Sequence, residues 1–160
     1  MQRSNIIHLM MILTVAMTMV SCNRKTVYDR YLPTSDDGWE KCDTLTFCIP
    51  AVKENGTYKE EIGLRITDSY PFTKLCLIVE QTVMPAEVTR CDTLYCRLID
   101  DDGKVKGRGL SHYQYKFHLT SIALAQGDSL CVNIRHNMRR EILPGISDVG
   151  MRLTNIQNGN

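Results

Sequence analysis

Hydrophobic and polar residues alternate along much of the chain, with the two-residue period that is typical of half-buried β-strands. The segments 43–49, 61–67, 92–100, 128–136 and 148–154 all follow this pattern. The positions predicted to face a core are Leu45, Phe47, Ile49, Ile62, Leu64, Ile66, Leu94, Cys96, Leu98, Leu130, Val132, Ile134, Val149, Met151 and Leu153. Segment 74–83 is a more continuous apolar run, which favours a central strand covered on both faces.

Short clusters of Gly, Pro, Asp and Asn separate these apolar segments and predict turns. They read KENGTY (53–58), SYPF (69–72), DDDGK (100–104), AQGD (125–128) and LPGIS (143–147). No segment sustains the 3.6-residue period of an amphipathic helix for long. Six to eight strands at this spacing predict an all-β fold, an antiparallel β-sandwich that is jelly-roll-like.

The N-terminal region differs from the rest, because Arg3 precedes the apolar run Ile6–Val20. This run is shorter than the about 20 apolar residues that a membrane-spanning helix needs. A positive start, a short apolar middle and a small-residue exit are typical of a secretory signal peptide. The run ends in Ser21 and Cys22, which resembles the lipobox of bacterial lipoproteins, although Met19 replaces the commoner leucine.

Cys22 is therefore the predicted lipidation site, and cleavage before it would make it the first residue of the mature chain. Two or three acyl chains hold a protein on a bilayer for long times, at about 0.8 kcal/mol per buried methylene. We expect a signal peptide in residues 1–21, a lipidated tether in residues 22–38 and a β-sandwich domain in residues 39–157. Trp39, at the start of this domain, is expected to anchor the tether on the core.

Charge argues against nucleic acid as a partner. The chain has 19 Lys and Arg and 18 Asp and Glu, and the signal segment contributes only Arg3. The mature chain is thus formally neutral, whereas phosphate binding needs a clustered cationic surface. The basic run Arg135–Arg140 is interpreted as a solvated strand end and turn.

Six cysteines remain after Cys22, namely Cys42, Cys48, Cys76, Cys91, Cys96 and Cys131. An even number in an exported chain favours disulfides. Most of them, however, lie among apolar residues, where a free thiol behaves as a small hydrophobe. We expect mostly buried thiols, with room for one bridge. No C-x-x-C pair is present and the histidines are scattered, so zinc is not predicted.

Other candidate chemistry also has a structural interpretation. The acidic run Asp100–Gly103 lacks the alternating ligands and the later glutamate of a calcium loop, and it is interpreted as a hairpin turn. His118 is expected to face water beside Lys116, and Cys131 and His136 should lie on opposite faces of their strand. No nucleophile elbow, zinc-protease motif or phosphate loop occurs. The sequence therefore predicts no enzyme, with no catalytic, cofactor or metal site.

Several motifs, taken in order, resemble the gliding-motility lipoproteins of the GldH type from Bacteroidota envelopes. They are VYDRY (27–31), Trp39, DTLTF (43–47), YPFTKL (70–75), CDTLYCRLID (91–100) followed by DDGKVKGRGL (101–110), and NMRREILPGISDVGMRL (137–153). The resemblance covers nearly the whole mature chain. It implies a lipoprotein associated with the outer membrane and connected with the gliding machinery. This family has no established catalytic residues that could be transferred to the chain.

Three functions remain open from the sequence, and the third, a hydrolase with an unfamiliar site, ranks far behind the others because no acid-base pair converges. The first is a non-catalytic scaffold that binds envelope proteins of the gliding or secretion machinery, held to the bilayer through acylated Cys22. No acidic run of the kind that resembles a surface-export signal follows Cys22, so we expect the protein to face the periplasm. The alternative is a carbohydrate-binding sandwich, which needs a row of exposed aromatic residues. The candidates for that row are Tyr28, Tyr31, Trp39, Tyr58 and Tyr70.

Overall fold

A computed structural model describes residues 26–100, 102–109 and 112–156. This part of the chain forms ten β-strands. They are β1 (Thr26–Pro33), β2 (Trp39–Glu40), β3 (Leu45–Ile49), β4 (Gly56–Thr67), β5 (Lys74–Met84), β6 (Val88–Arg97), β7 (His112–Leu124), β8 (Ser129–His136), β9 (Ile142–Leu143) and β10 (Ile146–Asn155). None of the described residues forms a helix long and apolar enough to cross a membrane.

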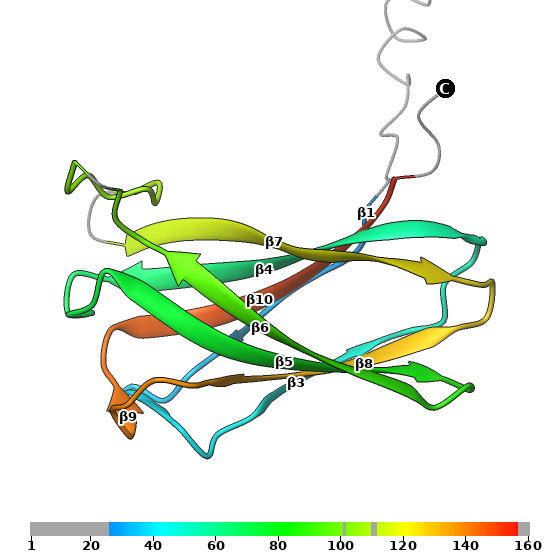
Figure 1. Ribbon diagram of the computed structural model, residues 1–160, viewed down its shortest axis with the longest axis horizontal. Helices are drawn as coiled ribbons and strands as arrows, with labels where there is room; N and C mark the ends of the chain where they lie inside the picture. Colours follow the sequence, from blue (N-terminus) through cyan, green and yellow to red (C-terminus); the bar gives the residue numbers. More distant parts are fainter. Residues whose placement is uncertain (1–25, 101, 110–111, 157–160) are drawn as a thin grey trace, which may run out of the picture.

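Eight of these strands form two four-stranded antiparallel sheets that pack face to face (Figure 1). One sheet has the order β1-β10-β4-β7 and the other the order β3-β8-β5-β6, while β2 and β9 pair separately. Most connections cross from one sheet to the other, and β5–β6 is a hairpin within one sheet. This wrapping order is that of a jelly roll. The predicted all-β sandwich is confirmed.

The core lies between the two sheets and contains most of the positions that alternation predicted to face inward. Side chains of both sheets that are at most 3% exposed include Phe47, Ile49, Ile62, Leu64, Ile66, Cys96, Leu98, Leu130, Val132, Ile134, Val149, Met151 and Leu153. Leu45 and Leu94 are only partly buried. Strand β5 is central, as predicted, but only alternate residues are buried and its other face is half-exposed. No described segment covers that outer face fully, so the expected burial on both sides is wrong.

The sandwich begins earlier than the expected domain boundary at residue 39. Strand β1 pairs along its length with β10, from Thr26 opposite Thr154 to Pro33 opposite Asp148. Asp29 and Arg30 are both exposed, and Asp29 lies 3.7 Å from the guanidinium of Arg152. Residues 26–33 are therefore an edge strand of the fold rather than part of a tether.

Trp39 closes one corner of the core and is fully buried. Its indole Nε1 donates a hydrogen bond to the carbonyl oxygen of Asp43 at 3.1 Å. His136, which is also buried, meets the indole edge to face at 5.3 Å between ring centroids. The short β2–β9 pair places Trp39 opposite Leu143. The expectation that Trp39 anchors the chain on the core is confirmed.

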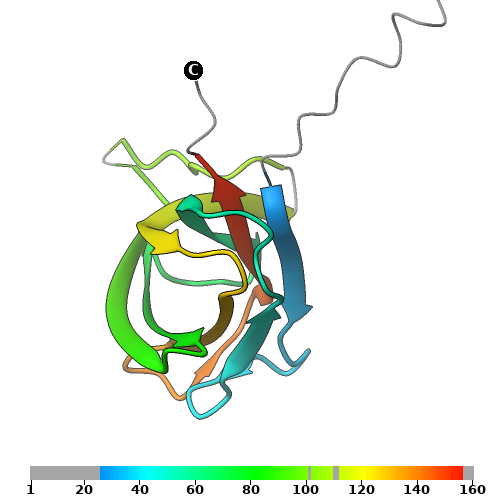
Figure 2. The same cartoon turned by 90° about the vertical axis from the view of Figure 1, so that its right-hand side faces the viewer.

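The described chain begins and ends at the same end of the sandwich (Figures 1 and 2). Thr26 is the register partner of Thr154, and the amide of Ile156 donates to the carbonyl oxygen of Thr57. The connection between β6 and β7 lies at the opposite end. At about 3.3 Å per residue, the strands separate these two ends by roughly 30–40 Å.

Candidate functional site

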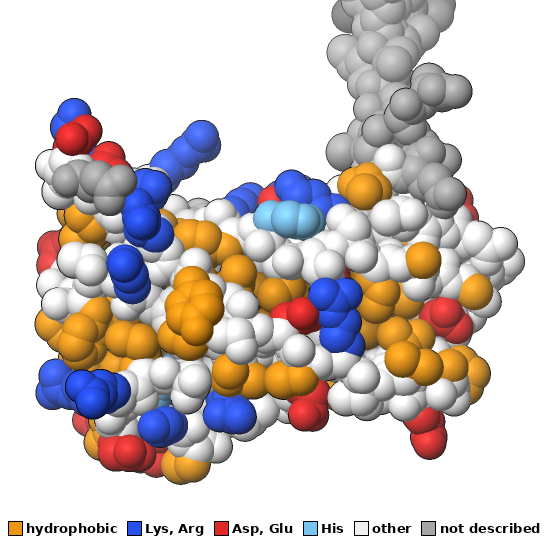
Figure 3. All heavy atoms as spheres, viewed as in Figure 1, with side chains coloured by type: hydrophobic (Ala, Val, Ile, Leu, Met, Phe, Trp, Pro, Cys, Tyr) orange, Lys and Arg blue, Asp and Glu red, His pale blue; other side chains and the backbone are white. Residues whose placement is uncertain are grey.

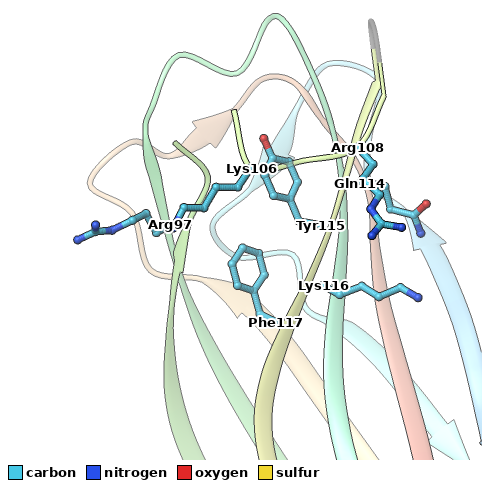
Figure 4. Close-up of a pocket in the computed structure, with 7 residues that line it drawn as sticks. All are labelled: Arg97, Lys106, Arg108, Gln114, Tyr115, Lys116 and Phe117. Carbon is cyan, nitrogen blue, oxygen red and sulfur yellow. The ribbon is translucent and has the colours of Figure 1, made fainter. Parts of the chain in front are cut away.

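A pocket of about 410 Å³ opens between the end of β6, the segment Lys106–Arg108 and the first half of β7. Its lining residues are Arg97, Lys106, Arg108, Gln114, Tyr115, Lys116 and Phe117. Figure 4 shows the two aromatic rings in the middle, Arg97 and Lys106 on one side, and Arg108, Gln114 and Lys116 on the other. The pocket therefore has an aromatic centre and a polar, basic rim.

Backbone pairing holds the segment Lys106–Arg108 in place. Arg108 and Gln114 exchange backbone hydrogen bonds of 3.0 and 2.9 Å, and the amide of Lys106 donates to the carbonyl oxygen of Leu98. Gly107 lies directly on an aromatic ring, because a Cβ there would come within 2.6 Å of the Tyr115 Cζ. A side chain at position 107 would thus push the basic segment away from β7.

All four charged side chains that line the pocket are cationic. The rings of Tyr115 and Phe117 are stacked, with centroids 6.1 Å apart and an interplanar angle of 8°. Burial raises the pKa of the Tyr115 hydroxyl above its ordinary value. This ring therefore stays neutral at physiological pH, and the charge of the pocket is positive. Such a site attracts anionic groups and offers apolar surface beside them.

The two strands next to the pocket are both sheet edges. Strand β6 pairs only with β5, and β7 pairs only with β4 along its length, so the sandwich is open between them in the described part of the chain. Backbone groups that point away from a neighbouring strand recur at every second residue. The backbone groups of Gln114 point toward Arg108 on the open side. Lys116 and His118 follow at every second residue, so their backbone groups point to the same open side.

Exposed apolar side chains accompany this open side. Tyr95 is 76% exposed and Val88 is 61% exposed, both on β6, and Val105 in the β6–β7 connection is 43% exposed. Figure 3 shows apolar side chains across this face, with blue cationic side chains gathered at the end where the connection lies. The surface thus combines apolar area with positive charge.

A buried polar pair links the two sheets inside the core. Glu60 on β4 is fully buried, and the Gln81 amide on β5, oriented with its nitrogen toward Glu60, donates to both carboxylate oxygens at 2.8 and 3.1 Å. Burial raises the pKa of Glu60 to about 7. The Gln81 hydrogen bond and the charge of Arg90 act in the opposite direction and limit this rise. Arg90 itself pairs with Asp92 at 2.8 Å. The pair has no route to a substrate and is interpreted as structural.

Tyr31 forms a second polar cluster on the outer face of the β1-β10-β4-β7 sheet. Its ring lies over two glycines, since a Cβ on Gly63 or Gly150 would come within 2.7 Å of it. Arg65 stacks over the ring with its guanidinium carbon 4.2 Å from the centroid. The Gln114 amide donates to the Tyr31 hydroxyl at 3.0 Å, which connects edge strand β1 to the pocket residue Gln114.

The predicted lipidation site, Cys22, lies outside the described residues. The six later cysteines are free thiols: Cys42, Cys48 and Cys91 are exposed, Cys76 and Cys131 are partly buried, and Cys96 is buried. The expectation of mostly buried thiols is therefore wrong. Their apolar neighbours occupy the alternate, inward positions, which leaves the cysteines outside. Cys48 and Cys131 are register partners on β3 and β8, whereas burial raises the pKa of the Cys96 thiol to about 12.

The other predicted features have the positions that the sequence assigned to them. His118 is exposed beside Lys116, and Cys131 and His136 lie on opposite faces of β8. Asp100 closes the acidic turn, because its carboxylate accepts hydrogen bonds from the amides of Asp102 and Lys104. The residues at which three potential metal ligands converge in the described chain are Glu40, Cys42 and Asp43, all exposed.

The aromatic residues proposed for a sugar-binding row do not form one. Trp39 and Tyr58 are at most 1% exposed, and Tyr31 lies flat on the glycines of its own sheet. Tyr70 packs against Phe72 and donates its hydroxyl to the carbonyl oxygen of Lys74. Strand alternation predicts which residues are buried within segments such as 43–49 and 61–67. It does not predict the exposure of aromatic residues that lie outside these segments. This support for the carbohydrate-binding alternative is lost.

Sequence reasoning missed the cationic pocket, although part of its signal is visible. Lys104, Lys106 and Arg108 recur at every second position in GKVKGRG. The remaining cations, Arg97 and Lys116, come from the strands on either side, and only the fold brings them together.

The fold and the pocket define a β-sandwich module with a basic surface at one end. Comparison with known sequences then gives the family: the model of the GldH lipoprotein family matches residues 26–153, and the chain belongs to this family. It is 30% identical over 150 residues to the gliding motility lipoprotein GldH of Flavobacterium johnsoniae, covering 89% of this chain and 92% of that protein. A gliding motility lipoprotein GldH homolog of Christiangramia forsetii is 26% identical over 147 residues, covering 86% and 89%. The protein is thus a membrane-anchored lipoprotein of the cell envelope.

Solved structures provide more distant similarities. A family GH115 4-O-methyl-alpha-glucuronidase with specificity for decorated arabinogalactans is 14% identical, with a TM-score of 0.46, over 85% of this chain and 18% of that one. The Eiger TNF of S. frugiperda is 12% identical, with a TM-score of 0.34, over 84% and 96%. Both scores are low, so the architecture rests on the strand order described above.

Proposed function

We propose that this lipoprotein is a non-catalytic scaffold that binds other envelope proteins of the gliding or secretion machinery through the open side between β6 and β7. The observation that carries the proposal is the combination, on this side, of two edge strands, exposed apolar side chains and a cationic pocket. Edge strands and apolar patches on soluble domains are typical of protein-binding surfaces. Family membership supports a role in motility.

Acylated Cys22 would hold the scaffold on the outer membrane, with the sandwich in the periplasm. The first described residue, Thr26, lies only a few positions after Cys22, so the end of the sandwich that contains Thr26 would face the lipid. The pocket lies at the other end, roughly 30 Å or more from the bilayer by strand length. Removal of the protein by protease treatment of intact cells would contradict this orientation.

Crosslinking in intact cells, followed by capture of the tagged protein, tests the scaffold function. Wild type is compared with Cys22→Ala, which cannot be lipidated. We expect a defined set of envelope proteins to be captured with the wild type and to be lost with the variant. If wild type and Cys22→Ala capture the same background proteins, the scaffold function is refuted.

A further inference from the structure

We infer that the cationic pocket and the adjoining edge of β7 bind an extended acidic peptide segment of a partner protein, which adds as a strand to β7. This inference rests on the proposed scaffold function and specifies the chemistry of its partner. Three properties of the described residues carry it: the sign of the charge, the free backbone edge and the aromatic centre of the pocket.

The charge is the first property. Arg97, Lys106, Arg108 and Lys116 line the pocket together with Gln114 and two aromatic residues, and none of the described lining residues is a carboxylate. Acidic groups near the pocket are already engaged. Glu61, which lies near Lys116, pairs with Lys59 at 2.9 Å, and Asp100 accepts hydrogen bonds from its own turn. The positive charges of Lys106, Arg108 and Lys116 therefore favour an anionic partner.

The free edge of β7 is the second property, and it favours a peptide over a sugar or a phosphate. The segment Lys106–Arg108 occupies only the first position on this edge, by pairing with Gln114. Beyond Gln114, the backbone groups of Lys116 and His118 point to the open side, where no described strand pairs with them. An added strand would continue along this edge and use these groups, which is the known mode of β-strand addition.

The aromatic centre is the third property. Side chains of a strand alternate between the two faces of a sheet. A strand added to β7 would point one set of side chains toward Tyr115 and Phe117, inside the opening, and the other set toward Lys116 on the outer face (Figure 4). The segment that fits has apolar and acidic residues in alternation. Its acidic groups would point to the side of the pocket where Arg108 and Lys116 lie.

A binding experiment on the full-length mature lipoprotein in detergent tests the inference. The probe is a short fluorescent peptide of alternating Glu and Val, and fluorescence anisotropy at low and moderate salt gives its affinity. One matched probe carries Gln in place of every Glu. A second matched probe is methylated at the backbone nitrogens along one edge of the peptide. We expect roughly tenfold weaker binding for either change, because the first removes the charge and the second blocks strand pairing.

Charge reversal on the protein provides the second arm. Lys106→Glu with Lys116→Glu should weaken binding of the acidic peptide roughly tenfold or more. The matched control is Lys53→Glu with Arg139→Glu, which reverses two exposed cations elsewhere and should leave the affinity unchanged. All four side chains are exposed, so both double variants should fold as the wild type does.

Three outcomes would overturn the inference. One is binding that survives backbone methylation, which means recognition of charge alone. Another is preferential binding of an acidic oligosaccharide such as oligogalacturonate, or competition by inorganic phosphate at equal concentration. The third is no binding of the peptide while crosslinking still captures partners, in which case the scaffold function stands and this pocket does not serve it.

Discussion

Two corners at the same end of the sandwich are built differently (Figure 1). At one corner, the β2–β9 pair places Trp39 over the core, and Trp39 and His136 are fully buried. At the other, the β6–β7 connection leaves a basic pocket with the half-buried ring of Phe117 in it. The first corner uses an aromatic residue to seal the fold, whereas the second leaves aromatic surface accessible.

The difference indicates that the Trp39 corner mainly stabilises the fold, whereas the pocket corner is available for binding. A buried indole with its hydrogen bond satisfied stabilises the domain and offers nothing to a partner. Accessible rings and cations beside free edge strands contribute less to folding and more to recognition. Mutations at the first corner should therefore affect mainly stability and those at the second mainly binding, which the first of three predictions tests.

The largest effect is expected at the sealed corner. Trp39→Ala removes a side chain with no solvent exposure and should lower the free energy of unfolding by about 3–5 kcal/mol. Phe117→Ala, at the open corner, should cost about 1–2 kcal/mol, because its ring is only partly buried. Urea denaturation of both variants measures the difference. Equal losses would mean that the open corner is as much a part of the core as the sealed one.

The buried Glu60 should make stability depend on pH in the opposite direction from an ordinary paired carboxylate. Its pKa in the folded state, about 7, lies above the ordinary value of 4.5, so folding favours the protonated form. The stabilising contribution is complete below pH 4.5 and is lost as the pH rises through about 7. The loss by pH 8 should amount to about 3 kcal/mol.

Urea denaturation at several pH values from 4.5 to 8 measures this dependence. Glu60→Gln keeps the shape of the side chain and should flatten the profile, because no proton is then exchanged. Glu54→Gln, an exposed carboxylate on the loop before β4, is the control and should leave the profile as in the wild type. Equal profiles for Glu60→Gln and the wild type would rule out the raised pKa.

The smallest of the three effects concerns the contact between Tyr31 and the glycines beneath it. Gly150→Ala places a methyl group within 2.7 Å of the Tyr31 ring and should cost about 1–3 kcal/mol. In a Tyr31→Ala background the same substitution should cost much less, because the ring is no longer there. A double-mutant cycle by thermal or urea unfolding measures this coupling. Additive costs would show that the clash is relieved in some other way.

Much of the fold follows from the sequence because strand period and turn residues are local signals. Alternation places Ile62, Leu64 and Val132 in the core, as the structure confirms. Strand β1 was missed because Asp29 and Arg30 interrupt its apolar pattern, and its pairing with β10 joins residues more than a hundred positions apart. The cysteines were misjudged from their neighbours, although the same alternation places Cys48 outside.

The pocket could not be predicted in the same way. Its cations come from β6, from a loop and from β7, and their convergence depends on the two sheet edges lying side by side. Only the alternating Lys104, Lys106 and Arg108 are visible as a local pattern. The meaning of this pattern depends on Gly107, whose missing side chain lets the segment lie against Tyr115.

The antiparallel pairing of β1 with β10 has a mechanical consequence. A pull on the N-terminal end, with a partner held at the far pocket, would be directed along the strands of the sheet. Hydrogen bonds between strands are perpendicular to the strands, so this load would shear the register from Thr26–Thr154 to Pro33–Asp148 as a whole, instead of opening it pair by pair. The Tyr31 ring packs over Gly63 and Gly150 and would resist such sliding sterically. Strand β1 is therefore placed to transmit tension into the domain.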